Sequence, residues 1–159
     1  MLKEELDKKR IYVIRKFINI ESIINIIISS HYFKDKDGRG IVRGDFLFQV
    51  LNDEYFQSIL RINILKKIVE DFDDKILSKL KALATIRNYL VHIDPNYFET
   101  DQKVNEETIN LVGYYPHPKN PKEKIDFEKE YNNFLELEKE VGKYLVDICK
   151  KYNLEFFKD

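Results

Sequence analysis

Apolar residues recur at helical spacing along most of this 159-residue chain. This spacing favours a helical fold over folds built from strands. All four prolines lie between Pro95 and Pro121, a region that has no helical period. The sequence therefore predicts an all-α fold. We expect an antiparallel bundle of about five helices, with a long ordered loop or a short hairpin before the last helix.

The predicted helices are bounded by residues that commonly begin or end helices. They cover residues 2–32, 45–51, 54–72, 73–92 and 126–152. Asp45, Asp73 or Asp74, and Asp126 are the expected N-caps. Pro95 forces the residue before it out of helical space, so the fourth helix should end near His92. A short strand or hairpin is also possible over residues 108–115.

Two of these helices carry apolar rows that bear on the site. In the first helix, Ile11, Ile14 and Ile18 follow one row of the predicted apolar stripe. The corresponding row of the fourth helix ends on an arginine and consists of Ile76, Leu80, Leu83 and Arg87. A charged residue that continues an apolar row needs a physical explanation.

Length and composition predict one domain over residues 1–159. Charged residues make up 35% of the chain and hydrophobic residues 43%, which excludes both a membrane protein and a disordered one. The 27 basic and 28 acidic side chains nearly balance, which argues against a broad, sequence-blind polyanion binder. A few local phosphate contacts remain compatible with this balance.

The expected compartment follows from the cysteine count and the apolar runs. Cys149 is the only cysteine, so neither an intrachain disulfide nor a cysteine-based zinc site can form. The first residues are acidic and lack the apolar stretch of a signal peptide. The most apolar run, residues 17–28, is too short to span a bilayer. We expect a cytoplasmic protein that does not enter a membrane.

The sequence signatures of common enzyme classes are missing. There is no glycine-rich phosphate loop followed by lysine, no dinucleotide fingerprint and no metalloprotease helix. His31, His92 and His117 lack metal-ligand spacing, so we expect neither a metal nor a cofactor. The acidic cluster at residues 70–74 could bind a cation, but such residues more often cap helices and form turns.

The segment RNYLVH, residues 87–92, combines three polar side chains at a predicted helix end. Asn88 and His92 are four residues apart and share a helix face, and the long Arg87 side chain can reach toward both. Histidine exchanges protons near neutral pH, and the arginine fork suits a phosphate. In metal-free RNA cleavage, a base deprotonates the ribose 2'-hydroxyl and positive charge stabilises the phosphorane. These residues could supply both roles.

A purely structural explanation of the same residues is also open. An arginine on an apolar row often extends its charged end to water or pairs with a buried carboxylate. A terminal histidine often caps the last carbonyl groups of its helix. The residues alone do not decide between the two explanations.

The same segment resembles the motif of HEPN domains, in which an arginine and a polar residue precede a histidine near the end of a bundle helix. Arg87, the polar Asn88 and, after three more residues, His92 fit this pattern. More loosely, the pair of helices over residues 46–68 and the long last helix resemble the branch that includes mannitol-operon-repressor-like proteins.

The resemblance implies an all-α bundle that forms a homodimer in which the two motifs face each other across a cleft. Many HEPN proteins are metal-independent endoribonucleases that act as toxins, in phage defence or in RNA processing. Arg87 and His92 would then be the catalytic pair, and Asn88 would orient His92 or the phosphate. The arginine on an apolar row would be explained because that row would face the partner chain.

Further residues are weaker candidates for RNA binding. Tyr89 lies within the motif and would either stack on a base or fill the interface. The glycine-rich loop carries basic side chains that could contact phosphates, although a solvated connecting loop is the alternative. These side chains are Lys34, Lys36, Arg39 and Arg43.

Two other functions remain open from the sequence. The chain could be a non-catalytic, HEPN-like regulatory module that binds a nucleotide or a protein, which the near-neutral charge favours. It could also act with an antitoxin or with a nucleotidyltransferase-like protein.

Overall fold

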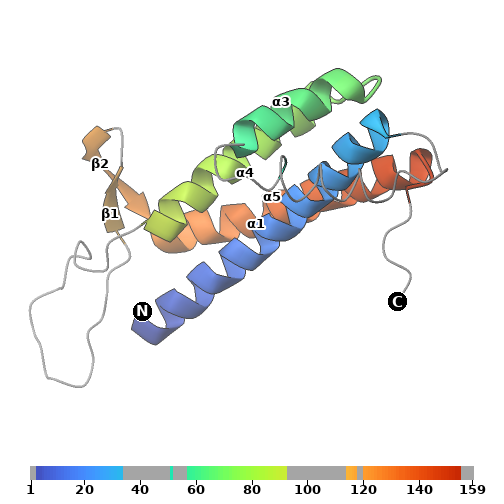
Figure 1. The fold of residues 1–159 in the computed structure, drawn as a ribbon. Coiled ribbons are helices and arrows are strands. Elements are labelled where there is room, and N and C mark those ends of the chain that lie inside the picture. The colour runs from blue at the N-terminus through green and yellow to red at the C-terminus, as the bar shows by residue number, and fades with distance from the viewer. Residues whose placement is uncertain (1–2, 34–50, 52–56, 93–113, 118–119, 155–159) are drawn as a thin grey trace, which may run out of the picture.

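The computed structural model describes residues 3–33, 51, 57–92, 114–117 and 120–154. Within them lie the helices α1 (Lys3–Tyr32), α3 (Ser58–Ile68), α4 (Asp74–His92) and α5 (Phe127–Lys151), and the strands β1 (Tyr114–His117) and β2 (Asn120–Asp126). The helices form a bundle with the hairpin at one end (Figure 1). The all-α class is confirmed, and four of about five predicted helices are seen. The short helix predicted over residues 45–51 lies almost entirely outside the described residues.

Ion pairs between helices give their directions. Lys9 pairs with Glu128, and Lys16 pairs with Glu138 about two to three turns further along both helices, so α1 and α5 are parallel. Successive helices alternate in direction in an antiparallel bundle of five, so its first and fifth helices are parallel, as α1 and α5 are. The successive helices α3, α4 and α5 are antiparallel, as predicted (Figure 1).

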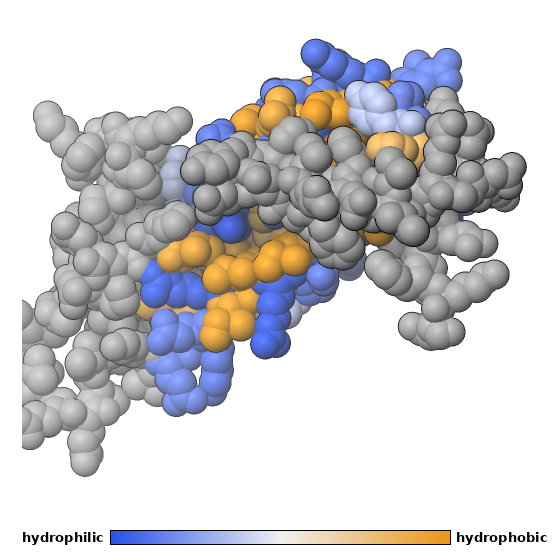
Figure 2. Space-filling model, in the orientation of Figure 1, coloured by the Kyte–Doolittle hydropathy of each residue, from blue (hydrophilic) through white to orange (hydrophobic). Residues whose placement is uncertain are grey.

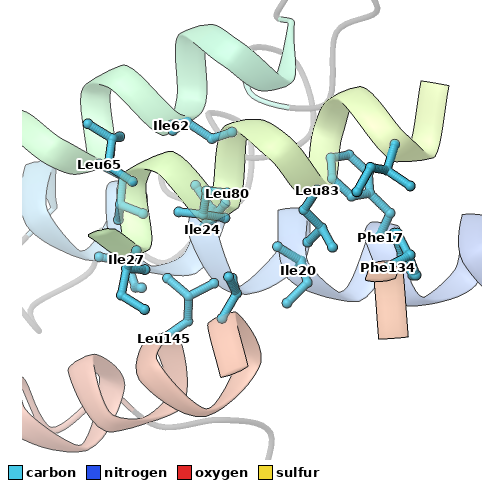
Figure 3. Close-up of a cluster of buried hydrophobic side chains, with 14 of the residues drawn as sticks. Phe17, Ile20, Ile24, Ile27, Ile62, Leu65, Leu80, Leu83, Phe134 and Leu145 are labelled. Atoms are coloured by element: carbon cyan, nitrogen blue, oxygen red, sulfur yellow. The ribbon is translucent and has the colours of Figure 1, made fainter. Parts of the chain in front are cut away.

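One hydrophobic core joins all four helices, and its side chains come from one face of each (Figure 3). The labelled members are Phe17, Ile20, Ile24, Ile27, Ile62, Leu65, Leu80, Leu83, Phe134 and Leu145. Burial of this apolar surface is the main force that holds the helices together.

The predicted N-caps of the last two helices are confirmed. The Asp126 side chain accepts a hydrogen bond from the Lys129 N–H at 3.1 Å, and Asp73 accepts one from the Lys75 N–H at 2.7 Å. However, α3 ends at Ile68 and not at residue 72, because Val69 is extended and Asp71 adopts a positive φ of 55°. This turn brings the Phe72 ring to 5.3 Å from the Tyr144 ring.

A buried ion pair fixes α3 against α1. Arg61 is only 8% exposed, and its Nη1 lies 2.7 Å from Glu21 Oε1. The Ser58 hydroxyl donates to the same carboxylate oxygen, and Arg61 Nη2 donates to the Leu51 carbonyl. The start of α3 is thus held to α1 by charge-assisted hydrogen bonds.

The strands β1 and β2 are antiparallel, with Tyr114 opposite Asp126 and an irregularity after Pro116. A hairpin is therefore present before the last helix. Strand β1 overlaps the predicted region, residues 108–115, at Tyr114 and Tyr115, and the rest of that region is outside the described residues. Prolines are compatible with a two-stranded sheet because each strand has a free edge, where no N–H group is needed.

None of the described helices combines the length and the apolar composition needed to cross a membrane.

Candidate functional site

The last turns of α4 carry the predicted site. This helix remains regular to His92, its final residue, as Pro95 predicts. Asn88 and His92 therefore occupy positions one turn apart on the same face of α4. The His92 side chain lies outside the described part of the structure.

Arg87 is held between α4 and α1. Its guanidinium carbon lies 5.5 Å from the centre of the Phe17 ring, a cation–π arrangement. Its Nη1 donates a 2.8 Å hydrogen bond to Asn88 Oδ1. Within the described residues, no carboxylate forms an ion pair with Arg87, and its buried Nε has no hydrogen-bond partner. Arg87 is thus a half-buried cation that no described acidic side chain neutralises, unlike the ion-paired Arg61.

The row that leads to Arg87 does not face a partner chain, so that prediction was wrong. Ile76, Leu80 and Leu83 are at most 6% exposed and belong to the core of their own bundle. Arg87 continues this row because it lies opposite Phe17 of α1, where an aromatic face rather than water or a carboxylate supports its charge.

Exposed apolar residues lie next to this row instead. Ile11 and Ile18 are 49% and 50% exposed, which corrects their assignment to the apolar stripe that faces the core. Each helical residue is rotated by about 100° from the one before it. Lys9 and Lys16 pair with α5, Arg10 and Phe17 contact α4, and the next residues, Ile11 and Ile18, therefore point away from both.

The same rotation applies to α4. Lys79 pairs with Glu140 of α5, and Ile86, one heptad later, is buried. Arg87 faces α1, and Asn88 is exposed on the side away from α5. Ile11, Ile18, Arg87 and Asn88 thus border one surface of the α1–α4 pair, which we term the open face.

Helix α3 covers the neighbouring part of the same side and begins at the level of Glu21, three residues beyond Ile18. Figure 2 shows an apolar patch over the N-terminal half of α1, bordered by hydrophilic residues. The open face therefore combines exposed isoleucines with an arginine that no described acidic side chain neutralises.

Of the weaker candidates, the structure describes only Tyr89, which does not join this surface. Tyr89 is two residues from Arg87, hence about 200° around α4, and it packs against the core. The loop cations Lys34, Lys36, Arg39 and Arg43 lie outside the described residues.

Arg10 was missed by the sequence analysis. Its Nε donates a 3.2 Å hydrogen bond to the Leu90 carbonyl, and its Nη1 lies 3.6 Å from Asp7. The only hint in the sequence is that Arg10 precedes Phe17 by one heptad and so shares its helix face.

Other reactive groups offer little chemistry. Burial raises the pKa of the Cys149 thiol to about 11, so this cysteine is not a nucleophile at neutral pH. In the part of the chain that the structure describes, no three His, Cys, Asp or Glu side chains are placed to hold a metal ion.

No family model matches this chain, and comparisons with curated proteins and with solved structures find no match. The chemistry open to the site follows from its own residues. A fixed guanidinium, an exposed amide and a histidine at the end of the same helix can bind a phosphate and transfer a proton.

Proposed function

We propose that this chain is a HEPN-type, metal-independent endoribonuclease of the cytoplasm, of the toxin or phage-defence kind. The observation that carries the proposal is the state of Arg87. Its guanidinium lies over Phe17, donates to Asn88 and has no carboxylate partner among the described residues. A half-buried cation of this kind is suited to an external anion, because forming that ion pair breaks none among the described residues.

The proposed reaction uses the residues at the end of α4. A base removes the proton from the ribose 2'-hydroxyl, and this oxygen attacks the adjacent phosphorus. The bond to the 5'-oxygen breaks, that oxygen takes up a proton, and the products carry a cyclic phosphate and a 5'-hydroxyl. Arg87 stabilises the phosphorane charge, His92 transfers the proton or positions the 2'-hydroxyl, and Asn88 orients the phosphate or His92.

We further propose that two chains pair through the open face and form a shared cleft. Ile11 and Ile18 support this proposal, since two half-exposed isoleucines in one row form an apolar surface that favours burial. In a symmetric dimer the same surface meets itself, so both copies of Arg87 approach the interface.

RNA cleavage in EDTA tests the activity. Purified protein is expected to cleave single-stranded RNA or transfer RNA without added metal. Arg87→Ala and His92→Ala are each expected to lower the rate by about 100-fold or more, because each removes a group that acts in the transition state. Undiminished cleavage in both variants would contradict the assignment, since a contaminating nuclease would then explain the activity.

A double variant of the open face tests the dimer. Ile11→Asp with Ile18→Asp is expected to weaken dimerisation by about 30-fold or more, the effect of removing interface hot spots. The matched control is Ile59→Asp with Leu60→Asp, which alters similarly exposed residues of α3, 41% and 44%. Sedimentation equilibrium measures both variants, and equal dissociation constants would rule out the open face as the interface.

The alternative is a non-catalytic, HEPN-like module that binds a nucleotide or a protein, such as an antitoxin or a nucleotidyltransferase-like protein. The exposed row of Ile11 and Ile18 favours it, because an apolar surface suits a protein partner as well as a second copy. Overexpression distinguishes the two functions. Growth arrest that depends on His92 supports the ribonuclease, and harmless expression supports the module.

A further inference from the structure

A single hydrogen bond links the end of α4 to a residue 80 positions away. Arg10 Nε of α1 donates to the Leu90 carbonyl at 3.2 Å. Leu90 is the third residue from the end of α4, so its carbonyl is one of the last four that lack a partner within the helix. Arg10 therefore satisfies a main-chain acceptor that α4 itself leaves open.

The position of this hydrogen bond relates it to the site. Leu90 lies three residues after Arg87 and two residues before His92, so it belongs to the backbone that sets their separation. Phe17, which lies about 10 Å from Arg10 along the same face of α1, supports the Arg87 guanidinium. One row of α1 thus contacts α4 at two points, one within the last turn of α4 and one just before it.

The charge of Arg10 adds to this effect. A cation at the C-terminal end of a helix interacts favourably with the partial negative charge of the unpaired carbonyls. The Arg10 side chain is only 15% exposed, and Asp7, 3.6 Å from Nη1, helps to hold its orientation. The hydrogen bond is therefore charge-assisted and partly shielded from water.

We propose that Arg10 is a positioning residue that holds the last turn of α4, and with it the spacing between Arg87 and His92. Its effect on catalysis rests on the ribonuclease proposed above, whereas its effect on the helix end does not. The two can therefore be tested separately on the same full-length protein.

The test compares Arg10→Gln, Arg10→Lys and the matched control Arg15→Gln, which removes the same charge from an exposed position of α1. In Arg10→Gln, amide hydrogens of residues 90–92 are expected to exchange about tenfold faster, as the loss of a charge-assisted hydrogen bond predicts. Arg10→Lys retains a donor and a charge and should restore most of the protection. Arg15→Gln should match the wild type.

Steady-state kinetics then test the role in catalysis. Arg10→Gln is expected to lower kcat about tenfold with KM changed by less than about twofold. The reason is that a protein in which Arg87 and His92 are misplaced still binds RNA but cleaves it slowly. Unchanged exchange at residues 90–92 would overturn the proposal whether or not the protein is a ribonuclease. Faster exchange with an unchanged kcat would also overturn it. If the wild type cleaves no RNA, the proposed function fails, and exchange alone decides whether Arg10 holds the motif.

Discussion

An Arg87→Lys variant is expected to cleave RNA about 100-fold more slowly than the wild type, although the positive charge is kept. The guanidinium is planar, so it can lie over the Phe17 ring, donate to Asn88 and still present further N–H groups to a phosphate. A lysine ammonium is a compact, strongly hydrated charge that cannot make these three contacts together. Single-turnover cleavage in EDTA measures the loss.

A conservative exchange elsewhere on α4 provides the control. Lys81→Arg changes an exposed residue of the same helix and should leave both the rate and the unfolding midpoint unchanged. Equal rates for Arg87→Lys and the wild type would show that charge alone suffices at this position, and the planar contacts would then have no catalytic role.

Removal of the buried Arg61 is expected to cost about 3–5 kcal/mol in the free energy of unfolding. An Arg61→Ala variant leaves the mostly buried Glu21 carboxylate with the Ser58 hydroxyl but without its cation. It also removes the donor to the Leu51 carbonyl. Urea denaturation measures the change, and Lys67→Ala on the exposed side of α3 should change stability by less than about 0.5 kcal/mol.

A double replacement separates the cost of a broken ion pair from the net value of the pair. Glu21→Leu with Arg61→Met fills the space with apolar side chains and leaves neither charge behind. It should recover most of the loss, because a buried ion pair often contributes little relative to apolar residues of similar size. A double variant as unstable as Arg61→Ala would mean that the ion pair itself stabilises the bundle.

The face that each helix buries was predictable only where polar residues mark the opposite face. In α5, apolar residues alternate with charged ones, and the spacing predicts a buried row. Four of its members are buried and Tyr131 and Leu137 are partly buried; the four are Phe134, Val141, Leu145 and Ile148. Helix α3 is apolar on several sides, so helical spacing predicts a buried stripe that includes Ile59 and Leu60, but these are 41% and 44% exposed. The buried residues are instead Ile62 and Arg61, and Arg61 is buried together with its ion-pair partner. Only the packing partners decide such cases.

The site was predictable to the extent that it is contiguous in sequence. Arg87, Asn88 and His92 lie on one helix whose end Pro95 indicates, and the helix does end at His92. The support for Arg87 comes from Phe17, and the contact at Leu90 comes from Arg10, both on α1. These contacts depend on which faces of two distant helices meet, and helical periodicity does not specify that pairing.

The division of α1 into three rows has a consequence for how this protein can diverge. Residues 9 and 16 contact α5, residues 10 and 17 contact α4, and residues 11 and 18 remain exposed. An insertion or deletion of one residue between Arg10 and Phe17 would rotate one set of contacts by about 100° against the other. Evolution along α1 is therefore freer in the identity of the exposed residues than in the length of this segment.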